Sequence, residues 1–286
     1  MIQKLTNIKN KMDFIHFKIN LFNNLNKKML IYVLLSTLLF STDDPVLNSI
    51  FEEASKRGIP KDFLEDTFDK NKIIIHEKIP DFFARPYEKK SWDIYKKIFV
   101  TPNRIDGGKR FYNEYGNIIQ KTISNNKVPV DPFIVVSIIG IESNYGLNKG
   151  KYTVFSALYT QILRMPKRSK WAKKQLVDFL VLCYQDKIPP HTIQGSYAGA
   201  FGYGQFIPSS FISYSVDGNN DGKREPYNWE DVFASIANYL VKNGYPTSNS
   251  DSKKIYKSIY AYNHADNYVK AVLSLSEEIK NSINKK

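Results

Sequence analysis

The chain has 286 residues, of which 42% are hydrophobic and 14% aromatic, so it can bury a sizeable core and is not disordered throughout. Its formal net charge of +13 attracts polyanions such as nucleic acid, acidic lipid or anionic wall polymers, but equally fits a solvated lysine-rich surface. The single cysteine, Cys183, excludes a disulfide within the chain and a thiolate metal site. Its apolar neighbours predict a buried helix position.

The first segment, residues 1–44, has the features of an export leader. Lys27 and Lys28 precede an uncharged apolar run, residues 29–40, which suits the core of a signal peptide. A membrane span needs about 20 residues, so the run is short for one. The charged part before it is long and no clear cleavage site follows. An uncleaved membrane anchor and an ordinary buried helix are therefore alternatives to a cleaved signal.

Helical periodicity dominates from residue 45 onward. The spacing of apolar residues and the turn residues predict helices over 45–57, 62–74, 89–99, 107–124, 131–143, 171–186, 229–243 and 253–286. Asp131 can cap its helix, with Pro132 in the first turn. The pattern therefore predicts a mostly helical protein with one principal domain, residues 45–275, followed by a polar tail, residues 276–286.

A carboxylate ends the most apolar of these helices. After "DPFIVVSII" the chain reads "GIESNYG", and burial at that point would raise the pKa of Glu142 toward that of a general acid near neutral pH. Ser143 and Asn144 can hydrogen-bond, Tyr145 would form an aromatic wall, and Gly146 permits a sharp turn. The alternative is a glutamate in the last turn that faces solvent.

Glycines alternate with aromatic residues in "GSYAGAFGYGQFIPSSF", residues 195–211. Such a segment can bring its backbone close to a ligand, and its rings can stack on one. It lacks the order of a phosphate-binding loop, and a purely structural loop is the alternative.

Six pieces in this order resemble the lytic transglycosylases of the MltB type, bacterial enzymes that cleave peptidoglycan. They are "RPYEKKSWDIYKKIFVTPNRI", "IGIESNYG", "YTVFSALYT", "GSYAGAFGYGQFIPSSF", "SIANYLVKNGY" and "YNHADNYV", and the match covers residues 46–273. The resemblance implies a mainly α (α+β lysozyme-like) fold, with a goose-type-lysozyme-like catalytic core and additional N-terminal and C-terminal helices. It also implies a monomer in the bacterial periplasm or cell envelope that binds peptidoglycan glycan strands and no nucleic acid.

The resemblance implies Glu142 as the single catalytic acid. Glu142 would protonate the glycosidic oxygen between N-acetylmuramic acid and N-acetylglucosamine, then act as base on the muramoyl 6-hydroxyl, which forms a 1,6-anhydro sugar. The substrate supplies its own nucleophile, so the second carboxylate of ordinary glycosidases is not needed, and no cofactor is required for the chemistry. The substrate contacts implied are Ser196, Phe201 (in place of the family's usual Met), Tyr203, Gln205, Tyr239, Tyr262, Asn263 and Tyr268. For Tyr268, core packing is an equal alternative.

Oxygen-bearing residues in "DGNNDGKREPYNWED" predict a structural calcium site. Asp217, Asn219 and Asp221, followed by Gly222, reproduce the front half of an EF-hand loop. The resemblance implies a longer loop, residues 217–231, with Asp231 as its closing ligand and the backbone carbonyl of Lys223 as another. A polar turn without metal is the alternative.

Other chemistries find little support. His76, His191 and His264 show no metal-ligand spacing, and the G-x-S-x-G elbow of a serine hydrolase is missing. The alternatives that stay open are a muramidase that admits water, a catalytically silent wall-binding protein of the same fold, and a basic nucleic-acid binder suggested by charge alone.

Overall fold

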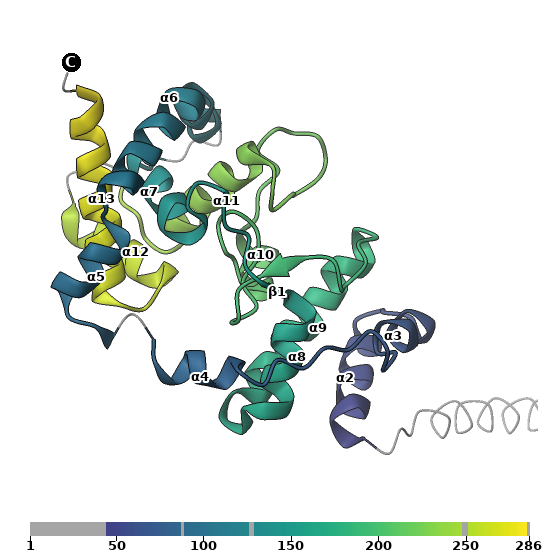
Figure 1. Ribbon diagram of the computed structural model, residues 1–286. Coiled ribbons are helices and arrows are strands. Elements are labelled where there is room, and N and C mark those ends of the chain that lie inside the picture. Colours follow the sequence, from purple (N-terminus) through teal and green to yellow (C-terminus); the bar gives the residue numbers. More distant parts are fainter. Residues whose placement is uncertain (1–43, 87–88, 126–128, 248–250, 285–286) are drawn as a thin grey trace, which may run out of the picture. The chain divides into compact units, whose positions relative to one another are not determined.

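The computed structural model describes residues 44–86, 89–125, 129–247 and 251–284 (Figure 1). The chain divides into two compact units, Met1–Glu53 and Ala54–Lys286. Helix α2 (Pro45–Lys56) begins in the first unit and ends in the second. The leader predicted from the apolar run 29–40 lies outside the described residues. Across the described ranges, we find no helix with the length and apolar character that a membrane span requires.

The second unit is mainly helical, with a very small antiparallel sheet, as predicted. Its helices are α3 (Lys61–Thr67), α4 (Ile79–Ala84), α5 (Trp92–Phe99), α6 (Pro102–Asn125), α7 (Pro132–Ser143), α8 (Val154–Arg164), α9 (Pro166–Gln185), α10 (Pro208–Tyr214), α11 (Trp229–Lys242), α12 (Ser252–Tyr262) and α13 (Asp266–Asn284). Strands β1 (Tyr152–Thr153) and β2 (Gln194–Gly195) pair with Tyr152 opposite Gly195.

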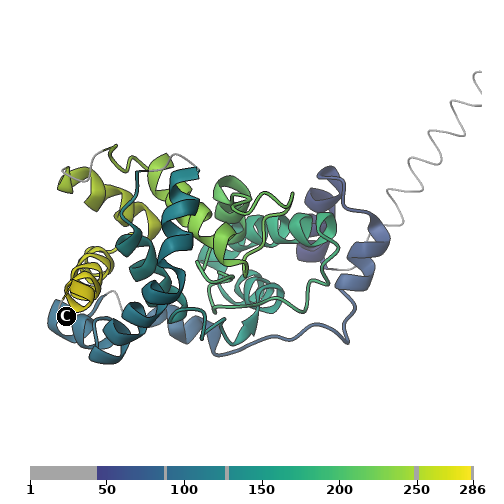
Figure 2. The ribbon, with the colours of Figure 1, turned by 90° about the horizontal axis from the view of Figure 1, so that it is seen from above.

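Helix α7 lies at the centre of one group of helices. Every residue from Ile134 to Gly140 is buried, because α6, α11 and α13 all pack against this helix (Figures 1 and 2). The predicted cap forms: the Asp131 side chain accepts a hydrogen bond from the Phe133 N–H at 2.8 Å, and Pro132 occupies the first turn. The all-round apolar character of "FIVVSII" thus corresponds to a helix buried on every side.

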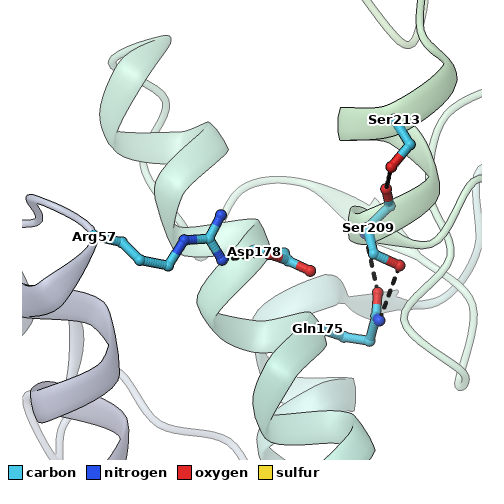
Figure 3. A network of polar contacts seen from close by, with 5 residues as sticks. All are labelled: Arg57, Gln175, Asp178, Ser209 and Ser213. Atoms are coloured by element: carbon cyan, nitrogen blue, oxygen red, sulfur yellow. Dashed lines mark hydrogen bonds and ion pairs between the residues drawn. The ribbon is translucent and has the colours of Figure 1, made fainter.

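Helices α8 and α9 form a second group, to which α10 is attached by polar contacts (Figure 3). The Gln175 side chain accepts from the Ser209 N–H and donates to the Ser209 hydroxyl, both at 3.0 Å. One turn along α9, Asp178 forms an ion pair with Arg57. Because Gln175 and Asp178 are both buried, these partners satisfy polar groups that would otherwise destabilise the core.

Several predictions differ from the structure. The helix predicted over 62–74 ends at Thr67, the one predicted over 253–286 is divided into α12 and α13, and α4, α8 and α10 were not predicted. The polar tail predicted for residues 276–286 belongs to α13 as far as Asn284, and Ile279 within it is fully buried. Helix α6 begins at Pro102 rather than residue 107, since proline suits a first helical turn. Helix α9 begins at Pro166 for the same reason, five residues before its predicted start.

Candidate active site

Glu142 lies in the last turn of α7 and is half-buried. Its Oε1 atom accepts a hydrogen bond of 2.7 Å from the Tyr268 hydroxyl, which comes from α13. Tyr268 is only 1% exposed, so this donor is delivered from the protein interior. The carboxyl group is therefore held from the core side and does not simply project into solvent.

The backbone turns sharply after this acid. Asn144, Tyr145 and Gly146 all have left-handed φ angles of 49°, 60° and 83°. Only glycine adopts such angles freely, so two non-glycine residues in succession require support from their surroundings. The Ser143 hydroxyl gives part of it by accepting from the Gly146 N–H at 3.1 Å.

The Tyr145 side chain gives the rest of that support. Its hydroxyl donates to the Arg104 carbonyl of α6 at 2.7 Å, and burial raises its pKa. The ring occupies a seam between α6 and α7 that we call the glycine seam, made by Gly107, Gly108 and Gly140. A Cβ atom on Gly140 would lie 2.6 Å from the Tyr145 hydroxyl, and one on Gly107 would lie 2.8 Å from its ring. Tyr145, predicted to form an aromatic wall, thus packs between α6 and α7. The Gly107-Gly108 pair within a predicted helix was the sequence feature that could have indicated this packing.

Two further tyrosines connect the Glu142 region to the glycine-rich loop. The Tyr262 hydroxyl donates to the Gly204 carbonyl at 2.6 Å, and its ring lies parallel to that of Tyr268 with centroids 6.4 Å apart. Burial, and next the charge of Glu142, raise the pKa values of Tyr262 and Tyr268 well above 10.0. Both tyrosines therefore remain hydrogen-bond donors at neutral pH.

Tyr239 and Asn263 shape the connection between α12 and α13. The Tyr239 hydroxyl donates to the Ala261 carbonyl at 2.7 Å, and burial raises the pKa of Tyr239 to about 12. Asn263 is half-buried and follows the last residue of α12, where its carbonyl accepts from the Ala265 N–H at 2.7 Å. The Tyr239 ring also lies 4.8 Å from that of Tyr262, centroid to centroid. That these two residues surround Glu142 stays a prediction.

The glycine-rich loop is a series of turns held by hydrogen bonds between residues a few positions apart. Ser196 exchanges hydrogen bonds with Ala200: its N–H donates to the Ala200 carbonyl at 2.8 Å, and its hydroxyl accepts from the Ala200 N–H at 3.2 Å. Gln205 has a φ of 49° and its side chain donates to the Gly202 carbonyl at 2.8 Å. Ser196 and Gln205 are both half-buried, so their polar groups lie at the surface of an ordered loop.

The two aromatic residues predicted to contact substrate differ from each other. Phe201 is 2% exposed and packs between Phe179 and Phe211, so its ring belongs to the core and the expected sugar contact does not fit its burial. Tyr203 is half-buried and stacks on Trp229 with ring centroids 4.1 Å apart. No sequence pattern selected Trp229 as a candidate site residue.

The predicted metal loop is ordered by its own side chains. The Asp217 carboxylate accepts from the N–H groups of Asp221 (3.1 Å) and Gly222 (2.8 Å), and the Asn219 side-chain Oδ1 accepts from the Asp221 N–H at 3.0 Å. Asp231 is buried, which raises its pKa, and it accepts from the N–H groups of Gly218 and Glu225 at 2.8 and 2.7 Å. In the part of the chain that the structure describes, no three His, Cys, Asp or Glu side chains gather as they would around a metal.

Comparison with known proteins identifies the family. The model of the transglycosylase SLT domain matches residues 42–255. The chain belongs to this family. Membrane-bound lytic murein transglycosylase B of Escherichia coli is 36% identical over 155 residues, which are 54% of this chain and 42% of that protein. The match thus spans less than half the length of this relative.

Solved structures of lytic transglycosylases share the fold. Soluble lytic transglycosylase SltB1 from Pseudomonas aeruginosa superposes with a TM-score of 0.75 at 26% identity, covering 84% of this chain and 99% of that one. The Escherichia coli lytic transglycosylase Slt35, solved in complex with calcium, gives a TM-score of 0.75 at 23% identity over 84% of this chain and 94% of that one.

Proposed function

We propose that this chain is a peptidoglycan lytic transglycosylase that cleaves the bond between N-acetylmuramic acid and N-acetylglucosamine without water. The observation that carries this proposal is a single half-buried carboxylate, Glu142, held by Tyr268 and connected through Tyr262 to the glycine-rich loop. That loop, residues 195–211, contains no Asp or Glu that could serve as a second catalytic group. Membership of the transglycosylase SLT family supports the same reaction.

The chemistry follows from one acid that acts twice. Protonated Glu142 donates its proton to the glycosidic oxygen as the bond to the anomeric carbon breaks. The carboxylate then accepts the proton of the muramoyl 6-hydroxyl, whose oxygen attacks the anomeric carbon to form the 1,6-anhydro ring. Tyr268 steadies the carboxyl group in both states, because its hydroxyl is a donor that keeps its proton. We infer that Ser196, Tyr203 and Gln205 line the sugar-binding surface.

The test compares purified full-length protein with its Glu142→Gln variant on peptidoglycan sacculi. Glutamine preserves size but cannot exchange the proton, so we expect turnover to fall by about 1,000-fold or more while binding to sacculi is retained. Release of soluble muropeptides, analysed by mass spectrometry, measures turnover, and sedimentation of the protein with intact sacculi measures binding. Retained turnover in the variant would contradict the role of Glu142.

The same mass spectra decide between the alternatives. Products ending in anhydro-muramic acid support a transglycosylase, whereas reducing muramic acid ends would show that the protein is a muramidase. A protein that binds sacculi but releases nothing would be the catalytically silent relative.

We also infer that the loop 217–231 holds a structural calcium ion. Calcium prefers oxygen ligands, and the Asp217 and Asn219 side chains already converge on the Asp221 N–H. The expected ligands are Asp217, Asn219, Asp221, the Lys223 carbonyl and Asp231. The relative solved with calcium supports this assignment. The ion would hold the loop and take no part in the proton transfers.

Calcium binding predicts a change in thermal stability. A ligand that binds only the folded state raises the unfolding temperature, so calcium should raise it relative to a chelator-treated sample. An Asp217→Asn/Asp221→Asn variant should lose this response, and magnesium at the same concentration serves as the ion control. An equal unfolding temperature with calcium and with chelator would contradict the site.

The cellular setting is part of the proposal. We infer an exported monomer of the periplasm or cell envelope that binds glycan strands, with residues 29–40 directing export or anchoring the chain to the membrane. Fractionation of cells that produce the full chain tests the location, and sedimentation tests the monomer. Recovery of the protein in the cytoplasm together with nucleic acid would favour the basic nucleic-acid binder instead.

A further inference from the structure

The outer side of helix α9 carries a cluster of cations in its first half. Lys167, Lys170 and Lys174 are exposed, and Trp171 lies among them and is half-buried. Their positions follow the spacing i, i+3, i+4 and i+7, so the four residues share one side of the helix. The first half of α9, residues 166–175, contains no acidic residue. We call this side, made by Lys167, Lys170, Trp171 and Lys174, the basic face.

Aromatic rings border the basic face and are held there by an arginine. The Arg168 guanidinium lies 4.3 Å from the centre of the Trp171 ring and 4.5 Å from that of Phe83 in α4. Both distances are within the range of a cation–π interaction. The Arg168 Nε also donates to the Gln161 side chain at 3.2 Å. Arg168 therefore joins the Trp171 ring of α9 to the aromatic residues of α4.

Helix α4, which packs against α8, extends this aromatic surface (Figure 1). Phe82 is 40% exposed, and the rings of Phe82 and Phe83 lie 5.3 and 5.0 Å from that of Tyr197, centroid to centroid. The exposed Arg85 follows the last residue of α4. A single exposed phenylalanine is ordinary in a folded protein. Phe82, however, is connected through Tyr197, Phe83 and Arg168 to the basic face.

Few acidic groups oppose these cations. Glu77 and Asp81 are the acidic residues of the segments 77–85 and 164–175. The Glu77 carboxylate is already paired with Arg164 at 2.8 Å. Asp81 lies in the first turn of α4 and is exposed. The surface is therefore strongly cationic, with aromatic rings beside the charges.

We propose that the basic face and the aromatic residues beside it dock on an anionic lipid bilayer. Lysine ammonium groups are attracted to acidic headgroups, and tryptophan rings favour the boundary between headgroups and acyl chains. The export or anchor role inferred for residues 29–40 brings the chain to such a surface. A phosphate-bearing wall polymer would attract the lysines equally, but it offers no apolar layer for Phe82. The inference goes beyond the proposed reaction and does not depend on Glu142.

The first experiment measures binding of the full-length protein to vesicles by sedimentation. Vesicles of phosphatidylcholine alone report binding through the apolar run 29–40, and the gain on adding phosphatidylglycerol reports the basic face. Lys167→Gln/Lys170→Gln/Lys174→Gln should weaken binding to the anionic vesicles by about 10- to 100-fold, because each lysine near the surface contributes about fivefold. Binding to the neutral vesicles should stay unchanged. High salt should reduce the gain of the wild type.

A matched variant controls for net charge. Lys96→Gln/Lys121→Gln/Lys242→Gln removes three charges from exposed positions on α5, α6 and α11. It should bind the anionic vesicles nearly as well as the wild type. Glutamine and lysine have similar helix propensities, so both triple variants should keep the wild-type unfolding temperature. Equal losses of affinity in the two variants would show that total charge drives binding and would overturn the proposal.

The second experiment tests whether the aromatic ring reaches the lipid. Vesicles that contain phosphatidylglycerol and brominated acyl chains should quench the tryptophan fluorescence of the wild type, and Trp171→Phe should lose most of this quenching. Equal quenching in both proteins would contradict insertion of Trp171. A glycerol-phosphate polymer serves as the competing ligand. If the substitutions on the basic face weaken binding to this polymer but not to anionic vesicles, the face binds wall polymer and the lipid assignment is wrong.

Discussion

At the scale of single residues, the contact between Tyr268 and Glu142 is the most consequential. The two residues are 126 positions apart in sequence and joined by one 2.7 Å hydrogen bond. Burial raises the pKa of Tyr268 well above 10.0, so its hydroxyl keeps its proton and remains a donor across the physiological range. A donor favours the charged form of the carboxylate that it contacts. In the proposed mechanism, this is the form that accepts the proton of the sugar hydroxyl.

Removing this donor should change the pH dependence of turnover. In Tyr268→Phe the carboxylate loses about 1.5 to 3 kcal/mol of stabilisation, so Glu142 should keep its proton to higher pH. We expect the alkaline limb of the kcat profile to move upward and kcat itself to fall by about tenfold or more.

Tyr256→Phe serves as the matched control. That tyrosine also donates to a carboxylate, Asp266, but at an exposed position, so its profile should equal that of the wild type. If the Tyr268→Phe profile also kept its wild-type limbs, Tyr268 would be a packing residue only.

At the scale of elements, the glycine seam sets how closely α6 approaches α7. Helix propensity alone favours alanine over glycine by about 1 kcal/mol, yet three glycines occur where the Tyr145 ring or Ile279 would meet a Cβ atom within 2.8 Å. The glycines therefore lower the helix propensity of α6 and α7 but allow Tyr145 and Ile279 to pack closely against them. The consequence of the seam is local to the acid, because Tyr145 lies three residues after Glu142 and fixes the turn that ends α7.

Two substitutions test the glycine seam. For the first, helix propensity alone predicts the opposite change in stability. Gly140→Ala should lower the free energy of unfolding by about 1 to 3 kcal/mol through overpacking, although an isolated helix would gain stability from the same change. Tyr145→Phe removes only the hydrogen bond to Arg104 and should cost about 1 kcal/mol. Urea unfolding measures both, and a more stable Gly140→Ala protein would rule out a tight seam.

At the scale of the whole molecule, buried tyrosines predict how stability depends on alkaline pH. Burial raises the pKa values of Tyr239 and Tyr245 to about 12 and those of Tyr262 and Tyr268 well above 10.0. The unfolded chain ionises its tyrosines near pH 10. A folded-state pKa above the unfolded one gives stability that is complete below the unfolded pKa and is lost as pH rises beyond it.

The free energy of unfolding should therefore stay level to about pH 9 and then fall. Each such tyrosine contributes a slope of about 1.4 kcal/mol per pH unit. Denaturant titrations across this pH range measure how the free energy of unfolding falls with pH. Tyr262→Phe should reduce this slope by the contribution of one tyrosine. Stability that stays constant to about pH 11 would contradict the burial of these hydroxyls.

Local sequence signals predicted the elements that depend on short-range chemistry. Asp131 and Pro132 marked the start of α7, the apolar run marked its complete burial, and Glu142 was correctly placed at its end. Cys183 was correctly predicted to be buried in a helix. These predictions succeed because capping, proline placement and hydrophobic periodicity act within one or two turns.

Only the tertiary structure decided which way the functional side chains face. Tyr145 and Phe201 occur in motifs that suggest a ligand surface, yet one ring enters the glycine seam and the other enters the core. Tyr262 meets Gly204 across 58 positions, a contact that no local pattern encodes. The sequence by itself thus determined most of the helices and the acid that ends α7. The direction of each aromatic ring depended on neighbours that folding brings from distant segments, because burial is a property of the packed molecule.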